Sequence, residues 1–187
     1  MTDKERPEVW VFIQNEDGRL LNVSLEILGK GRELANNLGG TLAAVLLGDI
    51  VKKLTRILIH SGADIVYLAE NSKLNNYNTL PYTRILSALI KKYKPEILLI
   101  GATPEGRDLA PRLASRLNVG LTADCTELKI GKFHDPLQKI FHPAILLQIR
   151  PALGGNIIAT IVSATTKPQM ATVREGVMPL PKINNTR

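Results

Sequence analysis

The strongest constraint on the fold is a regular alternation of two kinds of segment. Short, β-prone and almost uncharged runs occupy residues 9–13, 41–47, 65–69 and 96–100, and longer amphipathic segments separate them. Strands that are apolar on both faces and joined by amphipathic crossovers are typical of a parallel sheet covered by helices on both sides. We therefore expect a three-layer α/β/α fold on a mostly parallel, Rossmann-like sheet.

The segments between these runs have helical spacing and recognisable ends. Apolar residues recur at this spacing through 21–38, and Gly39 with Gly40 provides a stop. We expect Asp49 to cap a short second helix and Asn78 or Thr79 to cap a third, with Pro95 ending it. The segment 101–108 should open a fourth helix that carries Leu109, Leu113, Ala114 and Leu117.

The pattern changes after Asn118. Three β-prone runs, 123–130, 140–149 and 157–162, have short connections between them. The link Gly154-Gly155-Asn156 between two apolar runs predicts a hairpin, so the sheet should gain antiparallel strands near the C-terminus. Periodicity is lost beyond Pro168, and we expect one domain over residues 1–178 followed by a linker or tail over 179–187.

Charge and cysteine content narrow the function classes. Lys and Arg number 24 against 17 Asp and Glu, a net charge of +7 that favours an anionic partner. The densest basic run is only Lys91-Lys92-Tyr93-Lys94, and the aromatic residues are scattered, so we expect no nucleic-acid binding. The one cysteine excludes an internal disulfide and a Cys-x-x-Cys site and favours a reducing, cytoplasmic setting. No run reaches about 18 apolar residues, so we expect no membrane insertion.

The segment Gly101–Asp108 is the most informative local motif. It follows an apolar run and opens a helix, where a parallel sheet exposes backbone N–H groups and the helix dipole favours negative charge. Arg107 could pair there with a phosphate or carboxylate. Equally, Gly101 and Gly106 could only permit a tight turn beside a solvated Arg107. The segment matches neither Gly-x-Gly-x-x-Gly nor a Walker loop, and both interpretations stay open.

Other reactive residue types show no spacing that supports catalysis or metal binding. The histidines at 60, 134 and 142 lack metal-ligand spacing, and we expect ordinary surface or loop positions for them. Cys125 is expected to be a buried apolar residue, and Asp124 a strand cap rather than a ligand acceptor. Arg150 ends an uncharged run, where a strand-end charge is favoured over contact with an anionic partner. We predict neither catalytic residues nor a metal site.

Several long segments resemble one known family. Residues 101–114 and 120–125 are similar to the alpha subunit of electron transfer flavoproteins, as are 150–160 and 168–174 in the same order. The resemblance covers almost the whole chain as the family's amino-terminal domain. It implies an α/β domain of the adenine-nucleotide hydrolase-like type.

The resemblance also implies a function, a cofactor and partners. Family members pair with a beta subunit and carry electrons on FAD from dehydrogenases, such as acyl-CoA dehydrogenases, to a quinone reductase or another acceptor. Alpha subunits continue into an FAD-binding domain whose residues are absent here, so this chain alone should bind little FAD. What the resemblance assigns to this chain is a looser role near the partner's flavin or nucleotide, carried by Gly101, Thr103, Gly106, Arg107 and Arg150.

Two alternatives belong to other classes. One is a stand-alone module that binds AMP or ATP through residues 101–108. The other is a basic nucleic-acid-binding domain. If the resemblance to the flavoproteins holds, the chain is a component of an electron carrier rather than an independent catalyst. In either alternative it is a binding module.

Overall fold

The computed structural model describes residues 6–155 and 157–186. Its centre is a six-stranded sheet in which every pairing between neighbours is parallel, in the order β5-β4-β1-β6-β11-β7. The strands are β1 (Glu8–Ile13), β4 (Thr41–Gly48), β5 (Ile65–Glu70), β6 (Ile97–Gly101), β7 (Leu121–Cys125) and β11 (Gln169–Val173). The expected mostly parallel sheet is confirmed.

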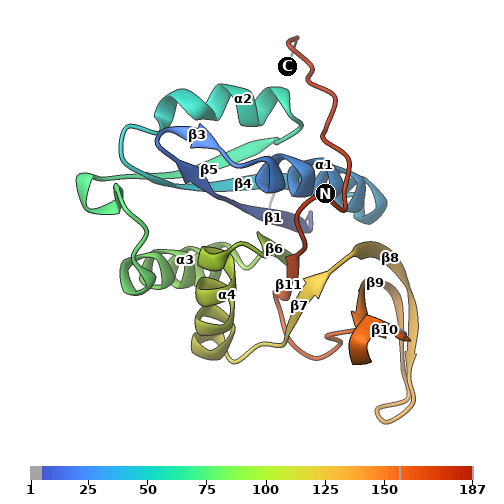
Figure 1. The fold of residues 1–187 in the computed structure, drawn as a ribbon. Helices are drawn as coiled ribbons and strands as arrows, with labels where there is room; N and C mark the ends of the chain where they lie inside the picture. The colour runs from blue at the N-terminus through green and yellow to red at the C-terminus, as the bar shows by residue number, and fades with distance from the viewer. Residues whose placement is uncertain (1–5, 156, 187) are drawn as a thin grey trace.

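Helices cover both faces of this sheet, as the apolar character of the strands predicts (Figure 1). In β1, Val9 and Val11 belong to the core under α1 (Asn22–Leu38) and α2 (Thr55–His60). Trp10 and Phe12 belong to the core under α3 (Thr79–Tyr93) and α4 (Pro104–Leu117). Because side chains alternate along a strand, one uncharged run supplies both cores, and the three-layer α/β/α arrangement follows.

The helix ends agree with the sequence in two cases and differ in one. Gly39 ends α1 with a left-handed φ of 63°, and the Asn78 side chain accepts a hydrogen bond from the Leu80 N–H at the start of α3. The expected Asp49 cap is wrong. A 3-10 turn, η2 (Lys52–Leu54), lies between Asp49 and α2, so the helix begins only at Thr55 and has no side-chain cap.

The antiparallel strands form their own sheet, which corrects the expectation that they extend the main one. Strands β8 (Glu127–Asp135), β9 (Ile140–Ala152) and β10 (Ile157–Ile161) have the order β10-β9-β8. The β9–β10 pairing is the predicted hairpin; the connecting turn η4 (Leu153–Gly155) has positive φ at Gly154 and Gly155, and Asn156 lies outside the described residues. A small hairpin of β2 (Asn15–Glu16) and β3 (Arg19–Leu20) and the turn η3 (Ser72–Leu74) complete the elements.

Two further expectations about strands are wrong. The run 123–130 is not one strand: it divides at Thr126, because β7 joins the main sheet and β8 the antiparallel sheet. Residues beyond Pro168 are not featureless, because β11 is inserted between β6 and β7 and all five of its residues are buried. The last strand along the chain therefore lies in the interior of the sheet.

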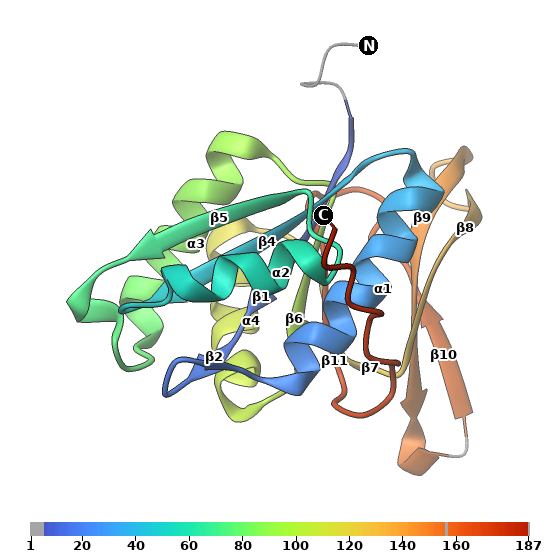
Figure 2. The same ribbon diagram turned by 90° about the horizontal axis from the view of Figure 1, so that it is seen from above.

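The segment after β11 runs back over α1 and α2 (Figure 2). Met178 is buried in the core, and residues 179–186 contain neither helix nor strand. The Asn184 N–H donates to the His60 carbonyl at 2.8 Å. A Cβ placed on Gly29 of α1 would lie 3.3 Å from Pro181 Cβ, so the glycine allows close approach of this segment.

The helices in residues 6–155 and 157–186 do not combine the length and the apolar character that crossing a lipid bilayer requires.

Candidate functional site

The carboxyl ends of three neighbouring strands lie level with one another. Val173 of β11 pairs with Gly101 of β6 on one side and with Cys125 of β7 on the other. In open parallel sheets, ligands bind beyond this edge. The residues that follow these strands, Ala102 and Arg174 among them, therefore occupy the expected position for a site.

The two glycines of the predicted loop have a packing role at this edge. A Cβ on Gly106 would lie 1.8 Å from the carbonyl oxygen of Gly101, so only glycine lets the first turn of α4 touch the end of β6. A Cβ on Gly101 would lie 2.5 Å from Gln14 Oε1 and 2.9 Å from Val23. The tight-turn interpretation accounts for both glycines, and their contact with a cofactor stays a prediction.

Thr103 caps α4 and is itself held from β1. Its Oγ1 accepts the Gly106 N–H at 3.1 Å, and Pro104 follows at the first helical position, where no N–H is needed. The Gln14 side-chain N–H also donates to Thr103 Oγ1. Glu105 lies in the same turn, and burial raises the pKa of its carboxyl, as does the charge of Glu16, while a hydrogen bond from Gln14 opposes the rise.

Asp124 is directed to the site by a β-bulge. Thr122 pairs with Ala171 and Cys125 with Val173, so β7 has one residue more than β11 across this interval. Asp124 has a left-handed φ of 63°, and its N–H donates to the Thr172 hydroxyl at 2.9 Å. Bulges often redirect a side chain next to a functional site, and here the carboxylate turns toward the sheet edge.

The Asp124 carboxylate bridges two arginines that come from different elements. Arg174, directly after β11, places Nη2 2.6 Å from Asp124 Oδ2. Arg107, in the first turns of α4, places Nη2 3.2 Å from Oδ1 and donates from Nε to the Ala102 carbonyl at 2.8 Å. Both arginines keep exposed guanidinium surface, whereas the Asp124 side chain is only 18% exposed.

Arg150, in the antiparallel sheet, acts on the same carboxylate through its charge, and the hydrogen bond from its Nε goes elsewhere. It lies near the end of β9, and the backbone contact from Thr126 N–H to the Ile149 carbonyl at 2.9 Å fixes this strand against the β7–β8 corner. Its Nε donates to the carbonyl of Pro151 at 3.3 Å, and its charge acts on Asp124. We call Arg107, Asp124, Arg150 and Arg174 the arginine–aspartate cluster.

The electrostatics of the cluster favour an anion. The hydrogen bond and charge of Arg174 lower the pKa of Asp124, with further lowering by Arg107 and Arg150, against an opposing effect of burial. The carboxylate therefore stays ionised at neutral pH, where two permanent positive charges pair with it and a third, that of Arg150, acts on it. The remaining guanidinium N–H groups are suited to bind a phosphate, a carboxylate or an anionic ring.

The cysteine and the histidines considered in the sequence do not take part in the arginine–aspartate cluster. Burial raises the pKa of the Cys125 thiol to about 12, so it is an inert core residue beside the cluster. His134 and His142 lie on β8 and β9, and His142 stacks on Phe133 with ring centroids 6.2 Å apart. Within the described residues, no group of three or more His, Cys, Asp or Glu side chains could hold a metal ion.

The structure brings some predicted residues together and separates others. Gly101, Thr103 and Gly106 form the β6–α4 turn, Arg107 pairs with Asp124, and the charge of Arg150 acts on the same carboxylate. Sequence reasoning left Arg174 without a role and favoured a cap function for Asp124. The bulge that redirects Asp124 depends on pairing with β11, and that strand was not expected.

The fold and site together define a Rossmann-like α/β domain with a cationic edge and a separate antiparallel sheet. The sequence model for the electron transfer flavoprotein domain matches residues 9–187, and the chain belongs to this family.

Curated relatives support the assignment. The chain is 50% identical over 171 residues to an electron transfer flavoprotein subunit alpha of Thermoanaerobacterium thermosaccharolyticum, covering 91% of this chain and 49% of that protein. It is 49% identical over 177 residues to the subunit alpha of Clostridium acetobutylicum, covering 95% and 50%. An acryloyl-CoA reductase electron transfer subunit beta of Anaerotignum propionicum is 40% identical over 184 residues, covering 91% and 50%. The chain spans about half the length of these relatives.

Proposed function

We propose that this chain acts as the amino-terminal half of an electron transfer flavoprotein alpha subunit. In this role it pairs with a beta subunit and presents the arginine–aspartate cluster to a flavin held largely by other parts of the complex. The family match and the half-length similarity to alpha subunits support the proposal. Electrons would pass from a dehydrogenase, such as one acting on acyl-CoA, to a quinone reductase or another acceptor.

The observation that carries the proposal is the pairing of Arg107 and Arg174 with one carboxylate at the sheet edge, where the charge of Arg150 also acts. An excess of fixed positive charge with exposed N–H groups fits an anionic cofactor. FAD supplies the electron-carrying ring and two phosphates when bound. The arginines favour the ring when it carries negative charge, and the ionised Asp124 keeps Arg107 and Arg174 in place. Gly101, Thr103 and Gly106 hold α4, and therefore Arg107, at this edge.

A surface for the beta subunit is proposed on the antiparallel sheet. β10 is an edge strand of that sheet, and its residues Ile157, Ile158 and Ile161 are 50%, 73% and 37% exposed. Exposed apolar residues in a row on an unpaired strand edge are typical of a surface that another chain covers. The surface adjoins Arg150 of β9, which pairs with Ala159 of β10, so a bound partner would also approach the cluster.

The nucleotide-module alternative has less support. The Gly106 N–H at the start of α4 is already satisfied by Thr103 Oγ1, and the Glu105 carboxyl lies in the same turn. A phosphate at that helix end would lose a donor and meet an acidic group. The cationic residues Arg107 and Arg174 instead meet at Asp124 of β7, which lies beyond β11 in the sheet order.

The test is reconstitution of the chain with a family beta subunit. We expect the isolated chain to bind no stoichiometric FAD and the complex to acquire a flavin spectrum. Ile158→Lys should abolish co-purification while the melting temperature changes by less than about 2 °C, because exposed substitutions usually alter stability by about 0.5 kcal/mol or less. Tight stoichiometric FAD on the isolated chain would contradict the proposal.

The role of Arg150 has its own readout. If Arg150→Gln removes about 1.4 kcal/mol of stabilisation from the reduced flavin, the two-electron potential of the complex falls by about 30 mV. Lys92→Gln, which removes one charge from the exposed end of α3, is the matched control and should leave the potential unchanged. Equal shifts in both variants would remove Arg150 from the site.

Two looser assignments belong to the same proposal. Residues 1–178 form the domain, and residues 179–187 act as the linker or tail, which the lack of helix or strand in 179–186 supports. A cytoplasmic location is supported by the single, buried cysteine.

A further inference from the structure

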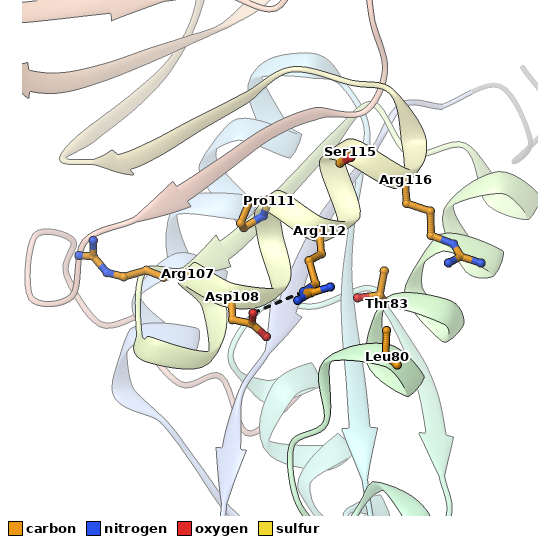
Figure 3. Close-up of a pocket in the computed structure, with 8 residues that line it drawn as sticks. All are labelled: Leu80, Thr83, Arg107, Asp108, Pro111, Arg112, Ser115 and Arg116. Carbon is orange, nitrogen blue, oxygen red and sulfur yellow. Dashed lines mark ion pairs between the residues drawn. The ribbon is translucent and has the colours of Figure 1, made fainter.

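A second cationic feature lies between α3 and α4 and shares Arg107 with the arginine–aspartate cluster. It is a groove of about 530 Å³ lined by Leu80 and Thr83 of α3 and by Arg107, Asp108, Pro111, Arg112, Ser115 and Arg116 of α4 (Figure 3). The volume falls within the range of about 300–1,000 Å³ that small-molecule sites occupy. We propose that this groove binds the phosphate group of a small molecule.

The charge of the two helices favours an anion here. α3 and α4 carry six basic residues against two acidic ones, and α3 contains no acidic residue. Arg107 lines the groove with its stem but turns its guanidinium away from the other lining residues (Figure 3). That guanidinium donates to Asp124 instead. The cations of the groove itself are therefore Arg112 and Arg116, which are four residues apart and lie on one side of α4.

Asp108 orients Arg112 and offsets part of its charge, while the Nη groups of Arg112 are not bound to Asp108. Its Oδ2 accepts hydrogen bonds from the Tyr77 hydroxyl at 2.7 Å and from Thr79, and its Oδ1 lies 3.6 Å from Arg112 Nε. These two hydroxyl hydrogen bonds lower the pKa of Asp108, so it stays ionised and holds Arg112 over the groove. The 3.6 Å separation is longer than a hydrogen bond, and the Nη groups of Arg112 remain available.

A buried hydroxyl supplies an independent indication of a ligand. Thr83 is 5% exposed, and its Oγ1 has no hydrogen-bond partner within the described part of the chain. The hydroxyl points toward Arg112 (Figure 3). A buried polar group without a partner carries a free-energy cost that a bound acceptor removes. A phosphate oxygen between Arg112 and Thr83 would accept from both.

The chemistry of the lining favours phosphate over a simple carboxylate. Two guanidinium groups and the hydroxyls of Thr83 and Ser115 can donate to the oxygens of a phosphate dianion, and the lining also contains the ionised Asp108 carboxylate, which is held by Tyr77 and Thr79. Leu80 and Pro111 form an apolar rim on which the organic part of a phosphate ester can rest. Arg116 has no ion-pair partner among the described residues, so it can close on the ligand without breaking an existing pair.

The test uses the 187-residue chain at low ionic strength, without flavin or beta subunit, so its outcome is independent of the proposed function. Calorimetry is done with inorganic phosphate, phenyl phosphate and citrate, and NMR of the Thr83 methyl group locates the site. We expect millimolar or tighter binding of the phosphates and at least tenfold weaker binding of citrate. Tighter binding of phenyl phosphate than of inorganic phosphate would identify an ester as the ligand, and equal binding would identify free phosphate.

Variants separate a built site from bulk charge. Arg112→Gln and Arg116→Gln should each weaken phosphate binding about tenfold, and Thr83→Val, which keeps the shape, about threefold. Lys92→Gln removes the same charge from α3 outside the groove and should change binding less than about twofold. No binding at 10 mM phosphate, citrate binding as tight as phosphate, or equal losses in Arg112→Gln and Lys92→Gln would each overturn the proposal.

Discussion

Replacing Gly106 by alanine tests how the first turn of α4 is held against the sheet. In an ordinary helix position, glycine to alanine stabilises by about 1 kcal/mol, because alanine loses less backbone entropy on folding. Here the added Cβ would lie 1.8 Å from the Gly101 carbonyl oxygen and 3.0 Å from its carbonyl carbon. Both atoms are backbone, so no rotation of a side chain can relieve the overlap.

The expected magnitude follows from these opposing effects. Forcing extra atoms into a packed contact costs about 1–3 kcal/mol, and a backbone contact belongs at the upper end of that range. After subtraction of the helix-propensity gain, Gly106→Ala should lower the free energy of unfolding by about 2 kcal/mol. For a chain of this size the melting temperature should fall by about 4–8 °C.

The assay is urea unfolding followed by circular dichroism, with Ser115→Ala as control. Ser115 is an exposed residue of the same helix, and the alanine there should stabilise by a few tenths of a kcal/mol. Because Arg107 follows Gly106 directly, the shift of α4 should also weaken its contact with Asp124. A Gly106→Ala chain that is as stable as the wild type, or more stable, would refute the close approach of α4 and β6.

Three further predictions concern residues near the sheet edge and the C-terminal segment. Asp124→Asn keeps a residue type that tolerates positive φ and removes the charge. Because the fold lowers the pKa of Asp124, its stabilisation is present above the unfolded value of 3.8 and is lost as pH falls through the lowered pKa. Urea unfolding should therefore show that Asp124→Asn lowers the free energy of unfolding by about 1 kcal/mol at pH 7 and has no effect near pH 2. A decrease that is the same at both pH values would contradict the charge effect. Cys125 should react with a disulfide reagent at pH 8 only after denaturation, because burial raises the pKa of its thiol to about 12. The absorbance of the thiolate that the reagent releases measures the reaction. Rapid reaction of the native protein would contradict the prediction. Gly29→Val should displace Pro181 and so speed tryptic cleavage after Lys182, which mass spectrometry measures. An unchanged rate of cleavage would show that close packing at Gly29 does not hold residues 179–186 against α1.

The main sheet could be predicted because each of its first four strands is recognisable alone. Runs such as 9–13 and 96–100 are uncharged over a length typical of strands, and the segments between them have helical spacing. Local composition decides such elements. β11 could not be found this way, because its five residues follow Pro168 closely and owe their strand conformation to β6 and β7, which lie far away in the sequence.

The same dependence on distant pairing explains which part of the candidate site was predicted. Arg107 lies in a strand–turn–helix motif that is visible in the sequence. The position of Asp124 depends on a bulge that exists only against β11, and Arg174 reaches the site because it follows that strand. The expected Asp49 cap was wrong for a different reason: a 3-10 turn lies between Asp49 and Thr55, where α2 begins.

The insertion of β11 also links completion of the fold to completion of the site. β6 and β7 do not pair with each other; each pairs with β11, so their carboxyl ends are joined only through this strand. Asp124 holds a left-handed conformation that costs a non-glycine residue about 1–2 kcal/mol, and the hydrogen bond to Thr172 and the ion pair with Arg174 compensate for it. Both partners come from β11 or the residue after it. The cluster therefore forms only when this strand is in place, and perturbations of β11 should disperse the arginines even where the rest of the sheet persists.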